Sequence, residues 1–470
     1  MSIIQRARGL RGGVGEFFGH PRGLAVLSGT ELWDRISFHG MQALLVLYMV
    51  EELLRPGHVE NIIGLTPLRR AIETVTGHLS SQALASQIFG IYVGLIYFTP
   101  VFGGMLGDRV LGRRRTVVVG ALLMTAGHFC MAFDRSFLLA LLLLIIGAGC
   151  LRGNLISQVG NLYAETDRRR DDAFQIYYVM LNSGAFVAPL ITGSLAQGYG
   201  WHYGFAFAGF GMLAGLVIYV SGKRYLPVDA RPEAGRRVTL NAGERRVILV
   251  QVLMLPVLTL FWIAQSQVWN TYNLWARDHV GLMIAGWRMP VPWLQAVDAL
   301  GAIVLVPPIL IFWKWQARRS REPDDFAKLG IGCLIYGASM AWLAAAGLVA
   351  DAGGKTPLAW VVAFHVLACT GYIYFAPIAV ALVSRTAPAA ANSMMVGVYY
   401  LSIFAGSMIS GRLGGLYESL SAERFWLLHA AIVAGAGLLI WVFTKSLRRE
   451  LIVNAAVFVP EPPAASSNNG

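Results

Sequence analysis

The sequence is poor in charged residues and in cysteine. Only 14% of its 470 residues are Asp, Glu, Lys or Arg, whereas 56% are hydrophobic. A soluble protein of this length could not bury so much apolar surface. The four cysteines stand singly in apolar segments, so we expect neither a disulfide nor a cysteine-bound metal: Cys130, Cys150, Cys333 and Cys369. The composition excludes a soluble domain and predicts an integral membrane protein.

The patterns of an enzyme and of a nucleic-acid-binding protein are also missing. The formal net charge is +12, but the basic residues form short clusters between apolar segments, without aromatic residues on a soluble face. Outside one charge cluster in the first apolar segment, we find no nucleophile–base pair and no metal-ligand set. We therefore expect no enzymatic activity, no nucleic-acid partner, no metal and no organic cofactor. His128, His365 and His429 lie in different segments and are interpreted as packing residues whose hydrogen bonds are satisfied.

Twelve apolar segments reach the length of about 20 residues that a membrane-spanning helix needs. They are 24–53, 83–107, 114–133, 136–162, 173–197, 202–222, 247–275, 291–315, 327–350, 357–384, 392–415 and 424–445. Lys and Arg accumulate in cytoplasmic loops, and most of the 38 fall on one side if the N-terminus is inside. Both termini are therefore expected to be cytoplasmic.

A polar connection at 223–246, with two prolines and seven basic residues, divides the segments six and six. This division predicts an all-α membrane protein of the major facilitator fold, in which two six-helix bundles rock about a site at the midplane. The expected parts are an N-terminal stretch 1–23, a bundle 24–222, a linker 223–246, a bundle 247–446 and a tail 447–470. The tail is rich in Pro, Ser and Asn and is expected to be disordered.

The first segment carries Glu31, Asp34 and Arg35 at bilayer depth. Each such charge costs about 2.5–3.5 kcal/mol in a membrane unless it meets a cavity or a partner. On a helix Glu31 and Arg35 are i, i+4 neighbours and Asp34 lies on an overlapping face, so one guanidinium can lie between two carboxylates. An ordinary ion pair on a solvated helix is the alternative, but the apolar flanks favour a functional cluster that takes up a proton.

The second and third segments are joined by the sequence GGMLGDRVLGRRR at 103–115. Glycines permit close helix approach, and Asp108 followed by Arg113 in a tight cytoplasmic turn can hold helix ends together when that side is shut. The accumulation of basic residues in cytoplasmic loops would explain the arginines, but it would explain neither Asp108 nor the glycines. We therefore expect a gating role for this turn.

These motifs resemble those of the proton-coupled oligopeptide transporter family of the major facilitator superfamily. The family's first helix has Glu-x-x-Glu-Arg followed by Phe-x-Tyr-Tyr-Gly, which is similar to Glu31, Asp34, Arg35 and Gly40. Its fourth span, Gly-x-Gly-x-x-Lys-x-Asn, resembles 147–154 with Arg152 at the lysine.

The fifth span has a Phe-x-x-x-Tyr-x-x-x-Asn-x-Gly signature, which matches Phe174, Tyr178, Asn182 and Gly184. Further similar runs fall at 261–262, 293–295, 387–388 and 394–397. The resemblance covers nearly every span. It implies a proton-driven importer of di- or tripeptides in the cytoplasmic (inner) membrane of a bacterium, acting as a monomer in the lipid bilayer.

The sequence also departs from the family. Ser266 stands where a glutamate usually precedes Gln267, and Gln42 replaces the arginine that pairs with that glutamate. Both ends of one buried ion pair are thus absent together, which avoids an unpaired charge. Tyr372 falls on the glutamate that the family uses for the peptide amine, and Asp298 stands where asparagine is usual.

A dipeptide is a zwitterion, so a cavity that desolvates its ends needs a cation on one side and acceptors on the other. We expect Arg35 and Arg152 to bind the carboxylate, Asn182 the amide, and Asp298, assisted by Tyr372, the amine. Pairing of Asp298 with Arg152 in the empty carrier is an open alternative. Apolar walls are expected from Trp262, Tyr97 and Tyr399.

Proton coupling requires a carboxylate whose proton affinity differs between states, and the proton is the coupling ion expected here. Glu31 is the first candidate and Asp34 the second: protonated Glu31 releases Arg35 for substrate, and ionised Glu31 recaptures it. His39, one turn beyond Arg35, is a further candidate for relaying protons.

Two alternative functions remain open. One is a carrier of another small zwitterionic or anionic solute, and the other is a sensor of the same fold that does not transport.

Overall fold

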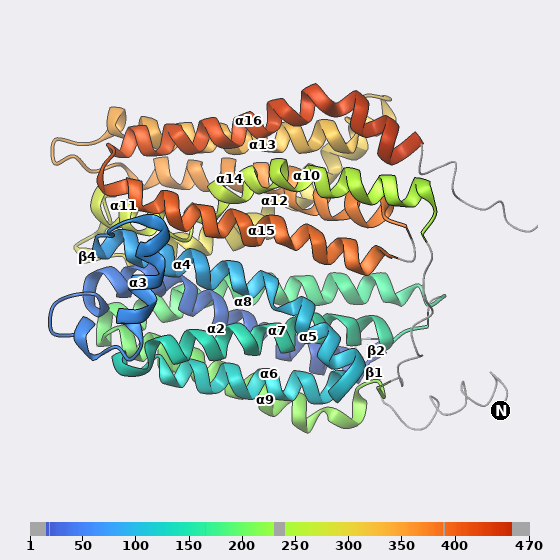
Figure 1. Cartoon of the computed structure of the whole chain (residues 1–470), viewed down its shortest axis with the longest axis horizontal. Coiled ribbons are helices and arrows are strands. Elements are labelled where there is room, and N and C mark those ends of the chain that lie inside the picture. Colours follow the sequence, from blue (N-terminus) through green and yellow to red (C-terminus); the bar gives the residue numbers. More distant parts are fainter. Residues whose placement is uncertain (1–15, 18, 165, 230–239, 389–390, 454–470) are drawn as a thin grey trace, which may run out of the picture.

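The computed structural model describes residues 16–17, 19–164, 166–229, 240–388 and 391–453. In this part of the chain twelve long helices run side by side along the longest axis (Figure 1). They are α2 (Arg22–Tyr48), α4 (Ser81–Phe98), α6 (Arg113–Cys130), α7 (Phe137–Asn161), α8 (Arg169–Tyr199), α9 (Trp201–Ser221), α10 (Ala242–Gln267), α12 (Trp293–Arg318), α13 (Asp325–Ala344), α14 (Leu358–Thr386), α15 (Asn392–Gly414) and α16 (Ala422–Arg448).

Short elements connect the long helices. The short helices are α3 (Leu65–Thr76), α5 (Pro100–Leu106) and α11 (Thr271–His279). Strands β1 (Glu16–Phe17) and β2 (His20–Pro21) pair antiparallel, as do β3 (Met283–Ile284) and β4 (Trp287–Arg288). The sequence analysis did not predict α3 or either hairpin, because each is too short to give a membrane-span signal.

The helices form two bundles that pack along each other (Figure 1). In the N-terminal bundle α2 packs against α8 and α9, and α6 packs against α7; in the C-terminal bundle α13 packs against α14 and α16. The bundles meet where α4 packs against α15 and α8 against α12. A Cβ at Gly90 of α4 would lie 2.5 Å from the carbonyl oxygen of Ser407, so this crossing requires glycine.

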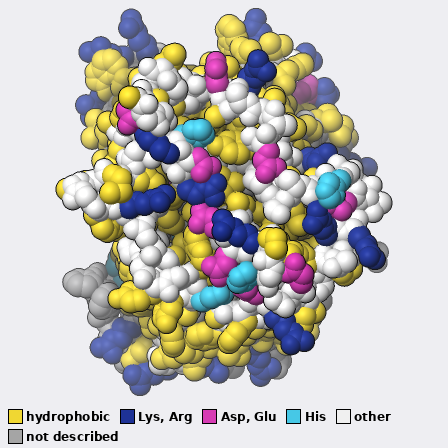
Figure 2. Space-filling view, turned by 90° about the vertical axis from the view of Figure 1, so that its left-hand side faces the viewer, with side chains coloured by type: hydrophobic (Ala, Val, Ile, Leu, Met, Phe, Trp, Pro, Cys, Tyr) yellow, Lys and Arg dark blue, Asp and Glu magenta, His cyan; other side chains and the backbone are white. Residues whose placement is uncertain are grey.

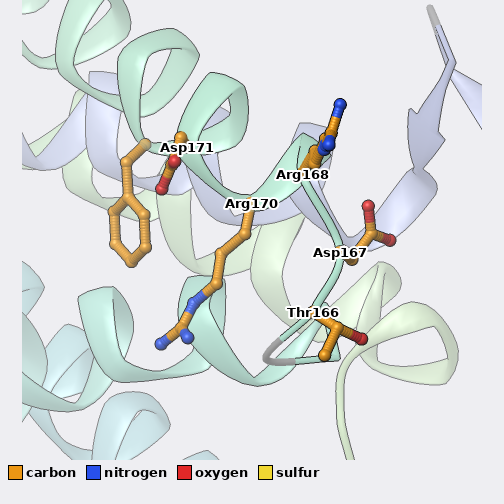
Figure 3. A pocket seen from close by; sticks show the side chains of 6 residues that line it. Thr166, Asp167, Arg168, Arg170 and Asp171 are labelled. Atoms are coloured by element: carbon orange, nitrogen blue, oxygen red, sulfur yellow. The ribbon is translucent and has the colours of Figure 1, made fainter.

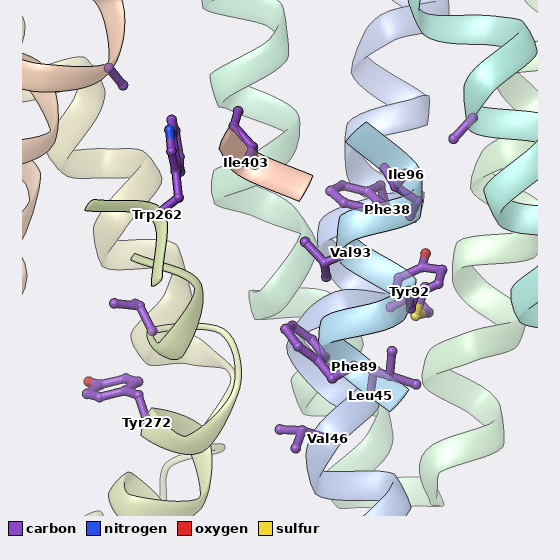
Figure 4. Packing of buried hydrophobic residues seen from close by; sticks show 14 of the residues in the cluster. Phe38, Leu45, Val46, Phe89, Tyr92, Val93, Ile96, Trp262, Tyr272 and Ile403 are labelled. Carbon is purple, nitrogen blue, oxygen red and sulfur yellow. The ribbon is translucent and has the colours of Figure 1, made fainter. Parts of the chain in front are cut away.

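Buried apolar side chains from both bundles complete the interior. Figure 4 shows Phe89 and Tyr92 of α4 beside Phe38 of α2, with Trp262 of α10 and Tyr272 of α11 in the other bundle. All five side chains are nearly inaccessible to solvent. Apolar side chains therefore fill the interior of both bundles, and buried polar residues are exceptions there.

Every one of the twelve predicted spans is occupied by a long helix. Ten helical segments of the described part are long and apolar enough to cross a membrane by themselves. The other two are α2, which carries three charges in its middle, and α6, which begins with three arginines. Both helices occupy predicted spans, but their charged residues lower their hydropathy.

The boundaries at the linker and tail differ slightly from those expected. α10 begins inside the expected linker at Ala242, because Asn241 and Glu244 cap its first turn reciprocally. α16 runs to Arg448 and a π-helical turn continues to Val453, so residues 447–453 of the expected tail are helical. Residues 1–15, 230–239 and 454–470 of the expected N-terminal stretch, linker and tail lie outside the described residues.

Polar contacts between the bundles gather at the end that carries α3 and the β3–β4 hairpin. Arg277 Nη1 lies 3.2 Å from Glu51 Oε1, Arg412 donates to the carbonyl of Thr76 at 2.8 Å, and Ser80 donates to Glu418. Ion pairs at the opposite end instead join residues of one bundle: Asp108–Arg113, Arg246–Glu450 and Arg385–Asp325. The bundles are thus fastened to each other at the α3 end.

Candidate functional site

A buried network of four charges lies between α2 and α7. Arg35 Nε lies 2.7 Å from Glu31 Oε1 and 3.7 Å from Asp34 Oδ2, and Arg152 Nε lies 3.4 Å from the same Asp34 oxygen. Glu31 and Asp34 are 1% and 0% exposed. The structure therefore brings together the three charges of the first helix and Arg152, with two charges of each sign.

Residues of α8 and α2 complete the surroundings of this network. Tyr177 donates a hydrogen bond of 2.5 Å to the second oxygen of Glu31. The guanidinium of Arg152 lies 4.0 Å from the centre of the Phe38 ring, a cation–π contact. Gly184 lets α8 approach, because a Cβ there would lie 2.8 Å from the Cβ of Arg35. The sequence analysis missed Tyr177, whose neighbour Tyr178 carried the family signature.

Asp34 and Arg152 have bonding capacity that the described residues do not use. Both carboxylate oxygens of Asp34, and Nε and one Nη of Arg152, are buried without a hydrogen-bond partner in the part of the chain described. Their ion pair is close enough for attraction but not aligned for a hydrogen bond. An unsatisfied buried polar group costs about 1–3 kcal/mol, so a ligand or water that supplied the missing bonds would be stabilised here.

Asp298 of α12 belongs to a second network, in the C-terminal bundle. His365 Nδ1 lies 2.6 Å from Asp298 Oδ1, and the other ring nitrogen lies 2.7 Å from the hydroxyl of Tyr272. Cys369 Sγ lies 3.3 Å from the carbonyl oxygen of Asp298. His365 is buried and both of its ring nitrogens have partners, one of which is the carboxylate of Asp298; the sequence analysis did not predict this pairing. In this conformation Asp298 pairs with His365, and Arg152 with Asp34.

The aromatic residues expected at the substrate site form two separate groups of ring contacts. Tyr372 meets Trp262 edge to face at 6.2 Å, Tyr97 of α4 stacks with Tyr400 of α15 at 6.3 Å, and Tyr399 meets Tyr400 at 5.6 Å. The Tyr97–Tyr400 pair crosses between the bundles. Trp262 Nε1 is buried and lies near the hydroxyl of Tyr399.

Asn182, Asp108 and Arg113 have their partners outside the charge network, whereas His39 lies close to Arg35 and Arg152. The amide of Asn182 donates to the carbonyl of Tyr178, one turn earlier on α8. Asp108 and Arg113 pair at 2.8 Å at the opposite end from α3, where Asp108 is exposed and Arg113 is partly buried. His39 lies in α2, with its ring 5.3 Å from that of Trp269.

A surface pocket lies away from these networks. It has a volume of about 340 Å³ and is formed where α8 begins (Figure 3). The pocket is lined by Thr166, Asp167, Arg168, Arg170, Asp171 and Phe174, none of which belongs to the charge network. Arg170 points across it toward α7, and a Cβ at Gly160 would lie 3.3 Å from its guanidinium. This pocket and the buried charge network are therefore at different places in the molecule.

Two helical bundles with buried ions near their contact define a multi-pass membrane transporter. The chain matches the family model PTR2, described as the POT family, over residues 114–237 and 233–427, and it belongs to this family. The family predicted from the sequence motifs is therefore confirmed.

Curated relatives and a solved structure agree with this assignment. The chain is 28% identical to the "Peptide transporter YePEPT" of Yersinia enterocolitica, over 85% of this chain and 88% of the relative. It is 27% identical to the "Di-/tripeptide transporter" of Lactococcus lactis subsp. cremoris, over 92% and 96%. A crystal structure of "peptide transporter POT in complex with sulfate" superposes with a TM-score of 0.83, at 26% identity, over 96% of this chain and 100% of the other. The predicted all-α membrane fold is confirmed.

Proposed function

We propose that this protein is a proton-coupled symporter that imports di- and tripeptides by alternating access. The observation that carries the proposal is the buried Glu31–Arg35–Asp34–Arg152 network, which holds charge and unused hydrogen-bonding capacity at membrane depth. Two relatives similar over most of their length are named as peptide transporters, which supports the substrate class. The protein acts as a monomer in the cytoplasmic membrane, with both termini inside.

The substrate carboxylate binds Arg152 and Arg35. Nε and one Nη of Arg152 are buried and have no hydrogen-bond partner among the described residues, and a guanidinium binds a carboxylate in a planar, bidentate manner. Asn182 contacts the peptide amide after it releases the carbonyl of Tyr178. Trp262, Tyr97 and Tyr399 provide apolar walls, which explains tolerance of different side chains.

The substrate amine binds Asp298 with help from Tyr372. Because Asp298 accepts from His365 in the present conformation, the amine shares or replaces that hydrogen bond. A ligand that contacts both bundles favours the closed state, since only differential contacts shift a conformational equilibrium.

The proton binds Glu31. Ionised Glu31 accepts hydrogen bonds from Arg35 and Tyr177, and protonation cancels the charge that holds Arg35. The freed guanidinium then attracts the substrate carboxylate, so proton and substrate bind together. Asp34, which contacts both arginines, is the second candidate carrier of the proton.

The polar contacts that join the two bundles lie at the α3 end. If the termini are cytoplasmic, the α3 end, where the bundles are fastened, faces outward. The Asp108–Arg113 turn lies at the cytoplasmic end, where it holds the bundles together once that side closes.

The experiment is uptake of labelled dialanine into proteoliposomes under an inward proton gradient. We expect Glu31→Gln to abolish accumulation but retain exchange of peptide across the membrane. The matched control is Glu60→Gln, an exposed carboxylate outside the network, which should retain both activities. Accumulation at the wild-type rate by Glu31→Gln would exclude Glu31 as the coupling residue.

A carrier of another zwitterionic or anionic solute is the second candidate function. The pairing of Asp298 with His365, together with Tyr372 in place of the usual glutamate, favours it because the amine site is weak. In the same assay it predicts no dialanine uptake and transport of a different solute by the same wild-type vesicles.

A further inference from the structure

Four potential metal ligands from four separate segments meet at the α3 end of the N-terminal bundle. Glu52 lies in the π-helical turn after α2, His58 in the following loop, Asp134 just before α7, and His202 in the first turn of α9. Figure 2, which looks onto this end, shows histidine and acidic side chains next to one another. The four residues are far apart in the sequence, so no sequence motif predicts the cluster.

Their donor atoms converge. One oxygen of Asp134 lies 2.6 Å from His58 Nδ1, and the other lies 3.8 Å from His202 Nε2. His202 Nε2 is also 3.4 Å from Glu52 Oε1. One ligand atom from each of Glu52, His58 and Asp134 lies within 4.8 Å of the others. The side chains of the four residues are between 17% and 45% exposed, so an ion can enter from water.

Neighbouring residues hold this cluster in place. Tyr48, which is fully buried, donates a 2.5 Å hydrogen bond to Asp134 Oδ1, and its ring meets the ring of His202 at 5.8 Å. Outer partners of this kind orient the ligands of metal sites. His202 Nδ1 is buried without a hydrogen-bond partner in the described structure, while Nε2 is directed at the two carboxylates.

We propose that Glu52, His58, Asp134 and His202 bind one divalent transition-metal ion, with Zn²⁺ as the representative. Two imidazoles and two carboxylates suit such ions, whereas Mg²⁺ and Ca²⁺ prefer ligand sets made only of oxygen. Bonds of about 2.0–2.2 Å in a tetrahedral site separate neighbouring ligand atoms by roughly 3.4 Å. The Glu52–His202 distance already fits this value, and the His58–Asp134 pair widens when the ion replaces its hydrogen bond. Two carboxylates also neutralise the charge of the ion.

The site lies beside a contact between the bundles. Glu51, the residue before Glu52, pairs with Arg277 of the C-terminal bundle. An ion bound here joins the ends of α2, α7 and α9 next to that contact. The inference is independent of the proposed transport function, because it concerns an ion at the end of one bundle and not the charge network.

The test is Zn²⁺ titration of the tag-free, full-length protein in metal-free detergent buffer, followed by calorimetry and thermal unfolding. We expect one Zn²⁺ per chain and a higher Tm, with no effect of Mg²⁺ or Ca²⁺ at the same concentration. His58→Gln and His202→Gln should each weaken binding at least about tenfold, as expected for loss of a ligand. Co²⁺ should give the visible absorption of a tetrahedral site in the wild type and not in these two variants.

His78 provides the matched control, because it is an exposed histidine at the same end, beside Glu73. His78→Gln should bind Zn²⁺ as the wild type does. The Tm of each variant without metal reports whether it is folded. Absence of Zn²⁺ binding by the wild type, or equal binding by a folded His58→Gln/His202→Gln double variant, would overturn the proposal.

Discussion

Asp34 is the most deeply buried charge of the central network, and its nearest cations are Arg152 at 3.4 Å and Arg35 at 3.7 Å. Burying a carboxylate is costly unless a cation stays close, so removal of one partner leaves an uncompensated charge. The two arginines therefore have a structural role as well as the proposed role in binding substrate. Mutations must separate the two roles.

Arg152→Ala should lower stability by about 3–5 kcal/mol, because Asp34 would lose its nearest cation. The Asp34→Asn/Arg152→Ala double variant should recover much of this loss, and Arg152→Lys should lose less. Thermal unfolding in detergent measures these differences. Peptide affinity of the folded variants then tests the binding role: unchanged affinity in both Arg152→Lys and Arg152→Ala would remove Arg152 from the substrate site.

For individual residues, the sequence predicted contacts within one helix better than contacts between helices. The i, i+4 spacing was enough to predict the Glu31–Arg35 pair, because the period of a helix fixes it. Tyr177 and the pairing of His365 with Asp298 were missed, because these contacts depend on how α8 and α14 are rotated against α2 and α12. One turn of sequence does not contain that information.

At the scale of elements, α3 is the clearest addition to the predicted fold. Its end is fastened to the start of α4 through Glu73, which accepts from Arg69 Nε at 2.9 Å and from the backbone N–H of Leu79 at 3.0 Å. Arg69 also donates to the carbonyl of Leu79 at 2.7 Å. A twelve-residue helix with few apolar residues gives no span signal, so only these tertiary contacts place it.

The docking of α3 should depend on pH. The hydrogen bond from Arg69, and then that from Leu79, lower the pKa of Glu73 from its ordinary value of 4.5. A lowered folded-state pKa means that the stabilisation is present above that ordinary value and is lost as the pH falls through the lowered pKa. We expect a spin label at Val75→Cys, an exposed position on α3, to become more mobile in that acidic range.

The variant Glu73→Gln should show the mobile spectrum already at neutral pH and change little on acidification. Glu60→Gln, a carboxylate outside this contact, should follow the wild type. A label whose mobility did not change with pH in the wild type would show that the ionised Glu73 does not hold α3.

For the long helices, length and hydrophobicity were sufficient. All twelve predicted spans contain a helix because the bilayer leaves few other ways to satisfy the backbone. Prolines inside α8, α10, α12 and α14 did not break them. Helix ends were harder to predict, since they depend on local caps such as Asn241 and Glu244.

At the scale of the whole molecule, the two bundles are held together at one end by polar contacts that could not be predicted from sequence. They join loops and helix ends far apart in the chain, such as Glu51 with Arg277 and Thr76 with Arg412. Gly90 and Ser407 bring α4 and α15 into backbone contact beneath them. This fastening, and not the span pattern, decides which side of the carrier is closed.

Arg277→Ala should shift the bundles toward a state that is open at the α3 end. The Arg277–Glu51 pair is about a quarter to a third exposed. A pair of this kind contributes about 0.2–1 kcal/mol, which changes the population ratio by roughly 1.4- to 5-fold. Spin labels at Val75→Cys on α3 and Met283→Cys on β3, both exposed, report the separation of the bundles by pulsed electron paramagnetic resonance. The long-distance population should grow, and initial uptake of peptide should change with it.

Arg246→Ala, which removes an ion pair with Glu450 within the C-terminal bundle, is the control and should leave the distances unchanged. Equal distance distributions for Arg277→Ala and the wild type, or the same shift in Arg246→Ala, would contradict the role of this pair as a latch between the bundles.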